Sequence, residues 1–197
     1  MMSLRLLRYG LWAAIAVLSL FLVFTYVSTR FGSETEGVKL GAPFNLTDQD
    51  GAPITQAAFE GHPTVLFFGF THCPEVCPTT LFEMAGWLKE LGDEGKDLRV
   101  FFISVDPERD TPEVMKGYTQ AFTDRITGIT GKPEEVEKLL KAWKIYAKKV
   151  PTENGDYTMD HTASVILLDR NGRLKSTIDY KESKDVALKK LQRLLAS

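Results

Sequence analysis

Two cysteines four positions apart are the residues of this sequence best suited to chemistry. Cys73 and Cys77, the only cysteines of the 197-residue chain, lie in the stretch Gly69-Phe70-Thr71-His72-Cys73-Pro74-Glu75-Val76-Cys77-Pro78. Residues four apart share one face of a helical turn, so the two sulfurs can meet. A helix N-terminus there would favour thiolate over thiol. Such a pair can form a reversible disulfide or chelate a soft ion such as Cu(I), and two inert buried cysteines are the alternative.

A nitrogen ligand that completes a metal site must come from one of three histidines. His62 stands between Gly61 and Pro63 in a turn, and we interpret it as a surface residue. His72 adjoins the first cysteine, but adjacent side chains seldom share a face, so we expect it to point away. His161 precedes a predicted strand at residues 163–168. In the fold that the elements below indicate, its loop lies beside the cysteine turn, which favours it as the ligand over a satisfied core histidine.

Buried strands alternate with helices along the chain. Continuous apolar runs predict strands at 64–70 and 98–105, and an apolar stripe predicts a helix over 78–91. Asp50-Gly51 and Asn171-Gly172 each mark a hairpin. Further elements are predicted at 126–130 (strand), 133–146 (helix), 174–178 (strand) and 185–195 (helix), and Asp110-Thr111-Pro112 opens another helix. This order predicts an α/β, thioredoxin-like fold in a single domain.

An uncharged stretch at residues 9–29 precedes this domain. About 20 apolar residues cross a bilayer as a helix, so the stretch predicts a transmembrane anchor. A cleaved signal peptide is the alternative, but no small-residue cleavage site follows. Arg5 and Arg8 on the N-terminal side predict an N-terminus in the cytoplasm.

The predicted organisation has four segments. Residues 1–8 form a cytoplasmic N-terminus, 9–29 a transmembrane anchor in the lipid bilayer, 30–37 a tether, and 38–197 the thioredoxin-like domain outside the cytoplasm. There the cysteines meet oxidising conditions, which makes their redox state a question. A formal net charge of -2 and the lack of a Lys/Arg block give no reason to expect a nucleic-acid partner.

Three motifs together resemble the Sco/SenC family. They are Gly-Phe-Thr-His-Cys-Pro-Glu-Val-Cys-Pro, Ser104-Val-Asp-Pro-Glu-Arg-Asp-Thr-Pro112 and Asp160-His161-Thr162, in this order between residues 38 and 196. The resemblance implies a thioredoxin fold, binding of Cu(I) and Cu(II) by Cys73, Cys77 and His161, and help in building the binuclear copper A centre of cytochrome c oxidase.

The same resemblance implies partners and a location. The acceptor would be subunit II of the oxidase, and a copper donor protein would load the site. The short segment before the anchor favours a bacterial cytoplasmic membrane, with the domain in the periplasm or outside, over a mitochondrial one. Asp106 and Arg109 would lie in a loop near the metal turn, although we interpret them as a turn in which Arg109 pairs with a neighbouring acid.

Three classes of function compete. The first, which we favour, is a metallochaperone, a protein that binds copper and catalyses no reaction. A thiol–disulfide reductase would use Cys73 and Cys77 as redox-active residues to keep oxidase or other extracytoplasmic cysteines reduced, although thioredoxin-type sites have two intervening residues and need no distant histidine. A thiol peroxidase is weakest, because Thr71 stands one residue closer to Cys73 than a Thr-x-x-Cys turn requires.

Overall fold

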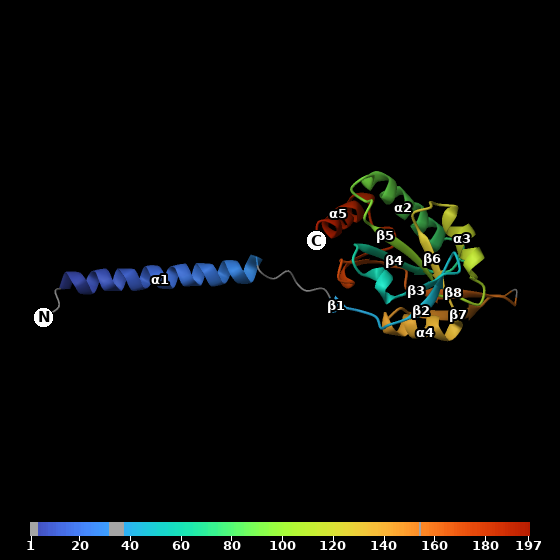
Figure 1. Ribbon diagram of the computed structural model, residues 1–197, viewed down its shortest axis with the longest axis horizontal. Coiled ribbons are helices and arrows are strands. Elements are labelled where there is room, and N and C mark those ends of the chain that lie inside the picture. Colours follow the sequence, from blue (N-terminus) through green and yellow to red (C-terminus); the bar gives the residue numbers. More distant parts are fainter. Residues whose placement is uncertain (1–3, 32–37, 154) are drawn as a thin grey trace. The chain divides into compact units, whose positions relative to one another are not determined.

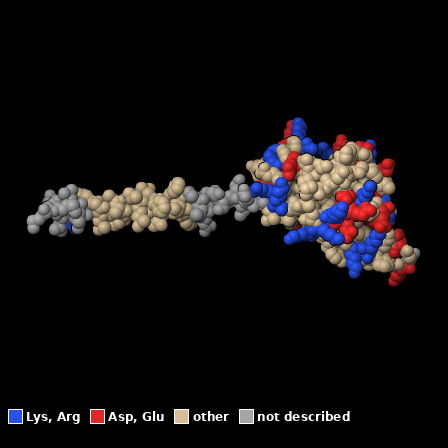
Figure 2. Space-filling model, turned by 60° about the horizontal axis from the view of Figure 1, so that its bottom comes forward, with Lys and Arg blue, Asp and Glu red and all other residues tan. Residues whose placement is uncertain are grey.

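The computed structural model describes residues 4–31, 38–153 and 155–197, which divide into two compact units on either side of Glu36 and Gly37. The first unit is helix α1 (Leu4–Phe31). Its described side chains are almost all uncharged (Figure 2). The stretch Arg8–Tyr26 is long and apolar enough to cross a membrane, a property that a signal sequence shares. Most of the predicted tether, residues 32–37, lies outside the described residues.

In the second unit, the described residues place eight strands in one sheet, in the order β1-β10-β9-β4-β5-β6-β2-β3 (Figure 1). These strands are β1 (Val38–Lys39), β2 (Asn45–Asp48), β3 (Pro53–Thr55), β4 (Thr64–Gly69), β5 (Arg99–Ser104), β6 (Thr127–Thr130), β9 (Val165–Leu168) and β10 (Arg173–Ile178). The helices are α2 (Val76–Leu91), α3 (Pro112–Gln120), α4 (Pro133–Ala142), α5 (Lys184–Leu195) and the short 3₁₀ helix η1 (Gln56–Phe59). A separate hairpin consists of β7 (Ala147–Pro151) and β8 (Tyr157–His161).

The centre of the sheet explains the apolar runs in the sequence. Strands β4, β5 and β6 are parallel, and β9 pairs antiparallel with β4. Every residue of β4 is buried, as expected for a strand covered on both faces. This mixed sheet with flanking helices confirms the predicted thioredoxin-like α/β fold. The helix that follows β4 is α2, so the end of β4 and the start of α2 hold the cysteine turn.

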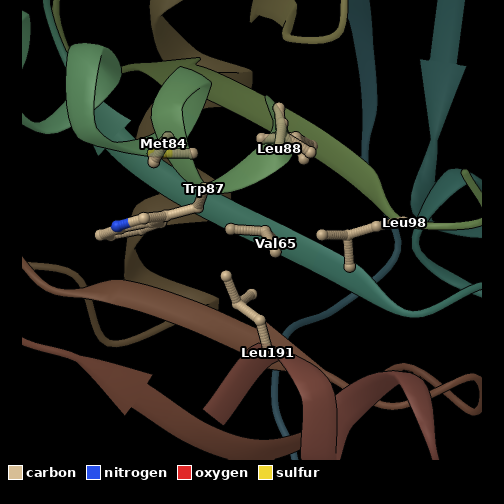
Figure 3. A pocket seen from close by; sticks show the side chains of 7 residues that line it. Val65, Met84, Trp87, Leu88, Leu98 and Leu191 are labelled. Atoms are coloured by element: carbon tan, nitrogen blue, oxygen red, sulfur yellow. The ribbon is translucent and has the colours of Figure 1, made fainter. Parts of the chain in front are cut away.

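Apolar side chains cover both faces of the sheet. On one face, Val65 of β4, Trp87 of α2 and Leu191 of α5 line one small apolar pocket (Figure 3). On the other face, Phe68 packs against Trp143 at the end of α4, with ring centroids 6.4 Å apart. Phe59 of η1 contacts both Phe101 and Trp143 on this face. This core fixes β4, from which the cysteine turn projects.

Three local predictions differ from the structure. Helix α2 begins at Val76 instead of residue 78, so the second cysteine lies within the helix. Helix α4 ends at Ala142 instead of about residue 146, because Lys144 takes a positive φ of 55° and turns the chain into β7. His161 ends β8 and does not open the next strand, which begins only at Val165. The hairpin was missed because four of the five β7 residues are exposed and carry no apolar alternation.

Candidate metal centre

The cysteine turn is built from the end of β4 and the first turn of α2. The Cys73 N–H donates to the Phe70 carbonyl (3.3 Å), which closes the turn. Cys77 is the second residue of α2, and its N–H donates to Cys73 Sγ (3.4 Å). The first N–H groups of a helix lack partners within the helix, so here the Cys73 sulfur supplies one. This places the sulfur at the positive end of the helix dipole, where a thiolate is stabilised.

Burial differs between the two cysteines. Cys77 is fully buried, whereas Cys73 is partly exposed. The buried sulfur has close contact with β4, since a Cβ added at Gly69 would lie 2.7 Å from Cys77 Sγ. The strand therefore needs glycine at this position to admit the sulfur. The outer sulfur at Cys73 remains accessible to a reaction partner.

His161 reaches the pair from the end of β8. Its Nε2 lies 3.6 Å from Cys77 Sγ, and its Nδ1 lies 2.8 Å from the Thr162 carbonyl oxygen. A carbonyl can only accept, so Nδ1 carries the hydrogen and a neutral ring presents a bare Nε2 to the sulfurs. The Phe70 ring supports the imidazole edge-on, with centroids 5.7 Å apart and an interplanar angle of 89°. The imidazole is thus held in the tautomer that can bind a metal.

The three ligand atoms of Cys73, Cys77 and His161 all lie within 4.8 Å of one another. Metal–sulfur and metal–nitrogen bonds of about 2.0–2.3 Å allow at most about 4.6 Å between two ligands of one ion. The group therefore needs only a small closure to surround an ion. Two sulfurs and one imidazole nitrogen form a soft donor set, which suits copper or zinc better than magnesium or calcium.

The sulfurs also share a proton unequally. The hydrogen bond from Cys77 lowers the pKa of Cys73, and the His161 side chain acts in the same direction. The same contact and burial raise the pKa of Cys77. In the reduced, metal-free protein, the partly exposed Cys73 is therefore the more acidic of the two thiols and the buried Cys77 the less acidic. This is the nucleophilic arrangement that disulfide exchange requires.

The other two histidines lie outside the group. His72 is exposed, and its Nδ1 lies 3.1 Å from the Thr71 hydroxyl. His62 precedes β4 at the opposite end of that strand, where its Nδ1 lies 2.5 Å from Asp97 Oδ1. Among the described residues, the cluster of potential metal ligands contains His161 and neither of these two.

Asp110 is a residue that the sequence interpretation assigned only to the start of a helix. In the structure Thr111 caps α3 by accepting from the Val114 N–H (3.4 Å). The buried Asp110 carboxylate instead accepts from the hydroxyls of Thr71 and Ser104, both at 2.6 Å, and from the Thr71 N–H. It thereby fastens the cysteine turn to the end of β5. No local sequence signal predicts this role, because Thr71 lies 39 positions away in the chain.

The structure confirms that Arg109 pairs with a neighbouring acid, Asp106. Arg109 Nε donates to Asp106 Oδ2 at 2.5 Å. The Asp106 side chain is fully buried and that of Arg109 is 17% exposed, so the pair is not an ordinary surface ion pair. Arg109 also contacts the hairpin that carries His161.

Comparison with known proteins agrees with this geometry. The SCO1/SenC family model matches residues 32–196. The mitochondrial protein SCO2 of Saccharomyces cerevisiae is 37% identical over 158 residues, 79% of this chain and 52% of the yeast protein. The chain thus spans about half the length of this mitochondrial relative.

Solved structures give the same result. The structure of Bradyrhizobium japonicum ScoI with copper bound is 48% identical, with a TM-score of 0.73 over 79% of this chain and 99% of that one. BsSco, in which a disulfide switch was identified and which belongs to the Sco family of cytochrome c oxidase assembly proteins, is 25% identical, with a TM-score of 0.64 over 82% and 96% of the two chains. The resemblance read from the three motifs is therefore confirmed, and this chain belongs to the SCO1/SenC family.

Proposed function

We propose that this chain binds copper through Cys73, Cys77 and His161 and delivers it to subunit II of cytochrome c oxidase. The observation that carries the proposal is the meeting of two sulfurs and a bare imidazole nitrogen within 4.8 Å. Thiolates suit Cu(I), and the imidazole adds a nitrogen that Cu(II) accepts. The copper-bound ScoI structure and the oxidase-assembly role of the Sco family support the assignment.

The exposure of the ligands suits a metal that must leave again. The buried Cys77 and the supported His161 give fixed ligands on the inner side. Cys73 stands on the outer side, partly exposed, where an acceptor protein can approach the ion. A site that is closed on one side and accessible on the other favours transfer by ligand exchange. A copper donor protein would load the ion from this same open side.

The location is part of the proposal. Residues 9–29 span a bacterial cytoplasmic membrane, residues 1–8 remain in the cytoplasm, and residues 30–37 tether the copper-binding domain, 38–197, on the outer side. The 28 residues of α1 supply about 42 Å at about 1.5 Å per residue, more than the roughly 30 Å of hydrocarbon. The same stretch would also serve as a signal sequence. Recovery of a soluble form that begins near residue 30 would support that alternative.

A thiol–disulfide reductase is the second candidate. The pairing of a partly exposed Cys73 of lowered pKa with a buried Cys77 favours it. An outer thiolate of this kind could attack a disulfide of the oxidase, and the inner thiol could resolve the mixed disulfide. Such chemistry would use the same two sulfurs as copper binding, so one protein can have both activities in its metal-free and metal-bound forms.

His161 separates the two candidates. Disulfide exchange needs two sulfurs and no imidazole, whereas the copper site needs the nitrogen ligand. His161→Ala should therefore still form and exchange the Cys73–Cys77 disulfide but lose most copper affinity, and it should fail to restore oxidase activity in a deletion strain. His72→Ala is the control and should behave as wild type. Full restoration by His161→Ala would favour the reductase over copper delivery.

A further inference from the structure

The hairpin that carries His161 is weakly attached to the rest of the domain. In the described residues, β7 and β8 pair with each other and not with the eight-stranded sheet. Their side chains are mostly exposed or half-buried, although Ala147 and Met159 pack against the core. Hydrogen bonds between Thr162 and Tyr146 close the base of the hairpin. Its position over the cysteines therefore depends on a few contacts.

Arg109 makes the densest set of these contacts. Its Nη1 donates to the Tyr157 carbonyl (3.0 Å), and its guanidinium carbon lies 3.8 Å from the centroid of the Tyr157 ring. Its Nε donates to Asp106, and the Tyr157 hydroxyl donates to the other oxygen of the same carboxylate (2.9 Å). Three side chains thus form a closed ring that joins the loop after β5 to the first residue of β8. We call this ring of Asp106, Arg109 and Tyr157 the latch.

The latch and the metal ligand lie on the same face of β8. Side chains of a strand alternate between its two faces, so residues 157, 159 and 161 point the same way. The Phe70 ring contacts both the latch and the metal ligand. The Arg109 guanidinium carbon lies 5.9 Å from the centroid of this ring, and the centroid of the His161 ring lies 5.7 Å from it. The Phe70 carbonyl also accepts from the Cys73 N–H. A shift of β8 at Tyr157 would therefore also move the imidazole of His161.

We propose that Arg109 is a positioning residue that holds β8, and with it His161, over the two cysteines. This inference rests on the proposed copper-binding function. Because the Asp106 side chain is fully buried and Arg109 largely so, solvent screens their ion pair weakly. Burial and the bond to Asp106 raise the pKa of Tyr157 to about 12, so its hydroxyl stays a donor at neutral pH. The competing explanation is that Arg109 only neutralises the buried Asp106.

Arg109→Lys distinguishes these two explanations. Lysine keeps a positive charge near Asp106, but it lacks the planar fork that bonds the carbonyl and stacks on the ring of Tyr157. Arg125→Lys is the matched control, because Arg125 is also partly buried and donates to backbone carbonyls, those of Gly95 and Leu98, away from the metal centre. Tyr157→Phe, which removes only the hydroxyl bond to Asp106, is a milder second variant.

The experiment uses full-length protein in detergent. Amide hydrogen exchange along β8 is measured in the reduced, metal-free protein, and the affinity for copper ions is measured by competition with a chelator. Arg109→Lys should speed exchange in residues 157–161 and weaken copper binding by about tenfold, since only the fraction with a docked hairpin binds. Tyr157→Phe should also speed exchange in these residues and weaken copper binding, but by a smaller factor than Arg109→Lys. The thiols should still form the disulfide as in wild type.

The possible outcomes distinguish a failure of the proposed role of Arg109 from a failure of the proposed copper-binding function. If Arg109→Lys matches Arg125→Lys in both exchange and copper affinity, Arg109 does not position the hairpin. If exchange in β8 rises but copper affinity stays at the wild-type value, the latch does not act through His161, and the inference is also wrong. If wild type itself retains no copper, the proposed copper function fails, whatever the exchange data show.

Discussion

Gly69→Ala should disturb the metal centre from within the core. The added Cβ would lie 2.7 Å from both Cys77 Sγ and Phe102 Cε2, whereas ordinary contacts are 3.4–4 Å. The sulfur and the ring must therefore each move by at least about 0.7 Å, or β4 must move away from them. Overpacking of this kind costs about 1–3 kcal/mol of unfolding free energy, and each kcal/mol lowers the Tm of a domain of this size by about 2–4 °C.

Copper binding should weaken together with the stability of the fold. A displaced Cys77 sulfur changes its 3.6 Å approach to His161 Nε2, so we expect copper affinity to fall at least about tenfold, or about 1.4 kcal/mol. Chelator competition on the reduced protein measures the affinity, and thermal unfolding of the metal-free protein measures the stability. Gly86→Ala is the matched control: it lies within α2, a Cβ there meets nothing within 4 Å, and it should stabilise by about 0.5–1 kcal/mol with unchanged copper binding. Equal behaviour of the two variants would refute the packing argument.

Three further predictions concern acid dependence, redox state and topology. Burial raises the pKa of Asp110, so its contribution to stability should be greatest below the ordinary carboxyl value of about 3.9 and decrease as pH rises through its folded pKa. Chemical denaturation of wild type and Asp110→Asn across acidic pH checks this, and a constant difference between them would contradict it. The oxidised protein with a Cys73–Cys77 disulfide, and either Cys→Ser variant, should lose tight Cu(I) binding in chelator competition, because a dithiolate is no longer available. A reporter fused after Ser197 should be active only outside the cytoplasm, and activity inside would reverse the proposed orientation.

The parts of the fold that could be predicted from sequence are those with strong hydrophobic patterns. Strands β4 and β5 are mostly apolar because they are parallel and covered on both faces. The stripe of α2 and the Asn171-Gly172 turn between β9 and β10 are equally local signals. In contrast, β1 is only two residues long and owes its existence to its pairing with β10. Such an element has no periodicity to detect.

The part of the metal centre that could be predicted from sequence is likewise the part that depends on local sequence. The spacing of Cys73 and Cys77 is local, and a strand-to-helix turn brings their sulfurs together. The approach of His161 depends on the β7–β8 hairpin. Strand β7 is mostly exposed and lacks an apolar pattern, although the Asn154-Gly155 pair before Tyr157 is a hairpin signal in the sequence. The supporting contacts of Asp110 and Arg109 join residues 39 and 48 positions away, which no local pattern reveals.

X-ray absorption of copper in the reduced full-length protein tests the central claim most directly. After anaerobic Cu(I) loading and removal of excess metal, we predict one copper per chain, coordinated by two sulfurs and one imidazole nitrogen. His161→Ala should lose the nitrogen contribution, and Cys73→Ser should lose one sulfur together with most of the retained metal. No retained copper in wild type, or the same coordination after His161→Ala, would contradict a copper site formed by Cys73, Cys77 and His161.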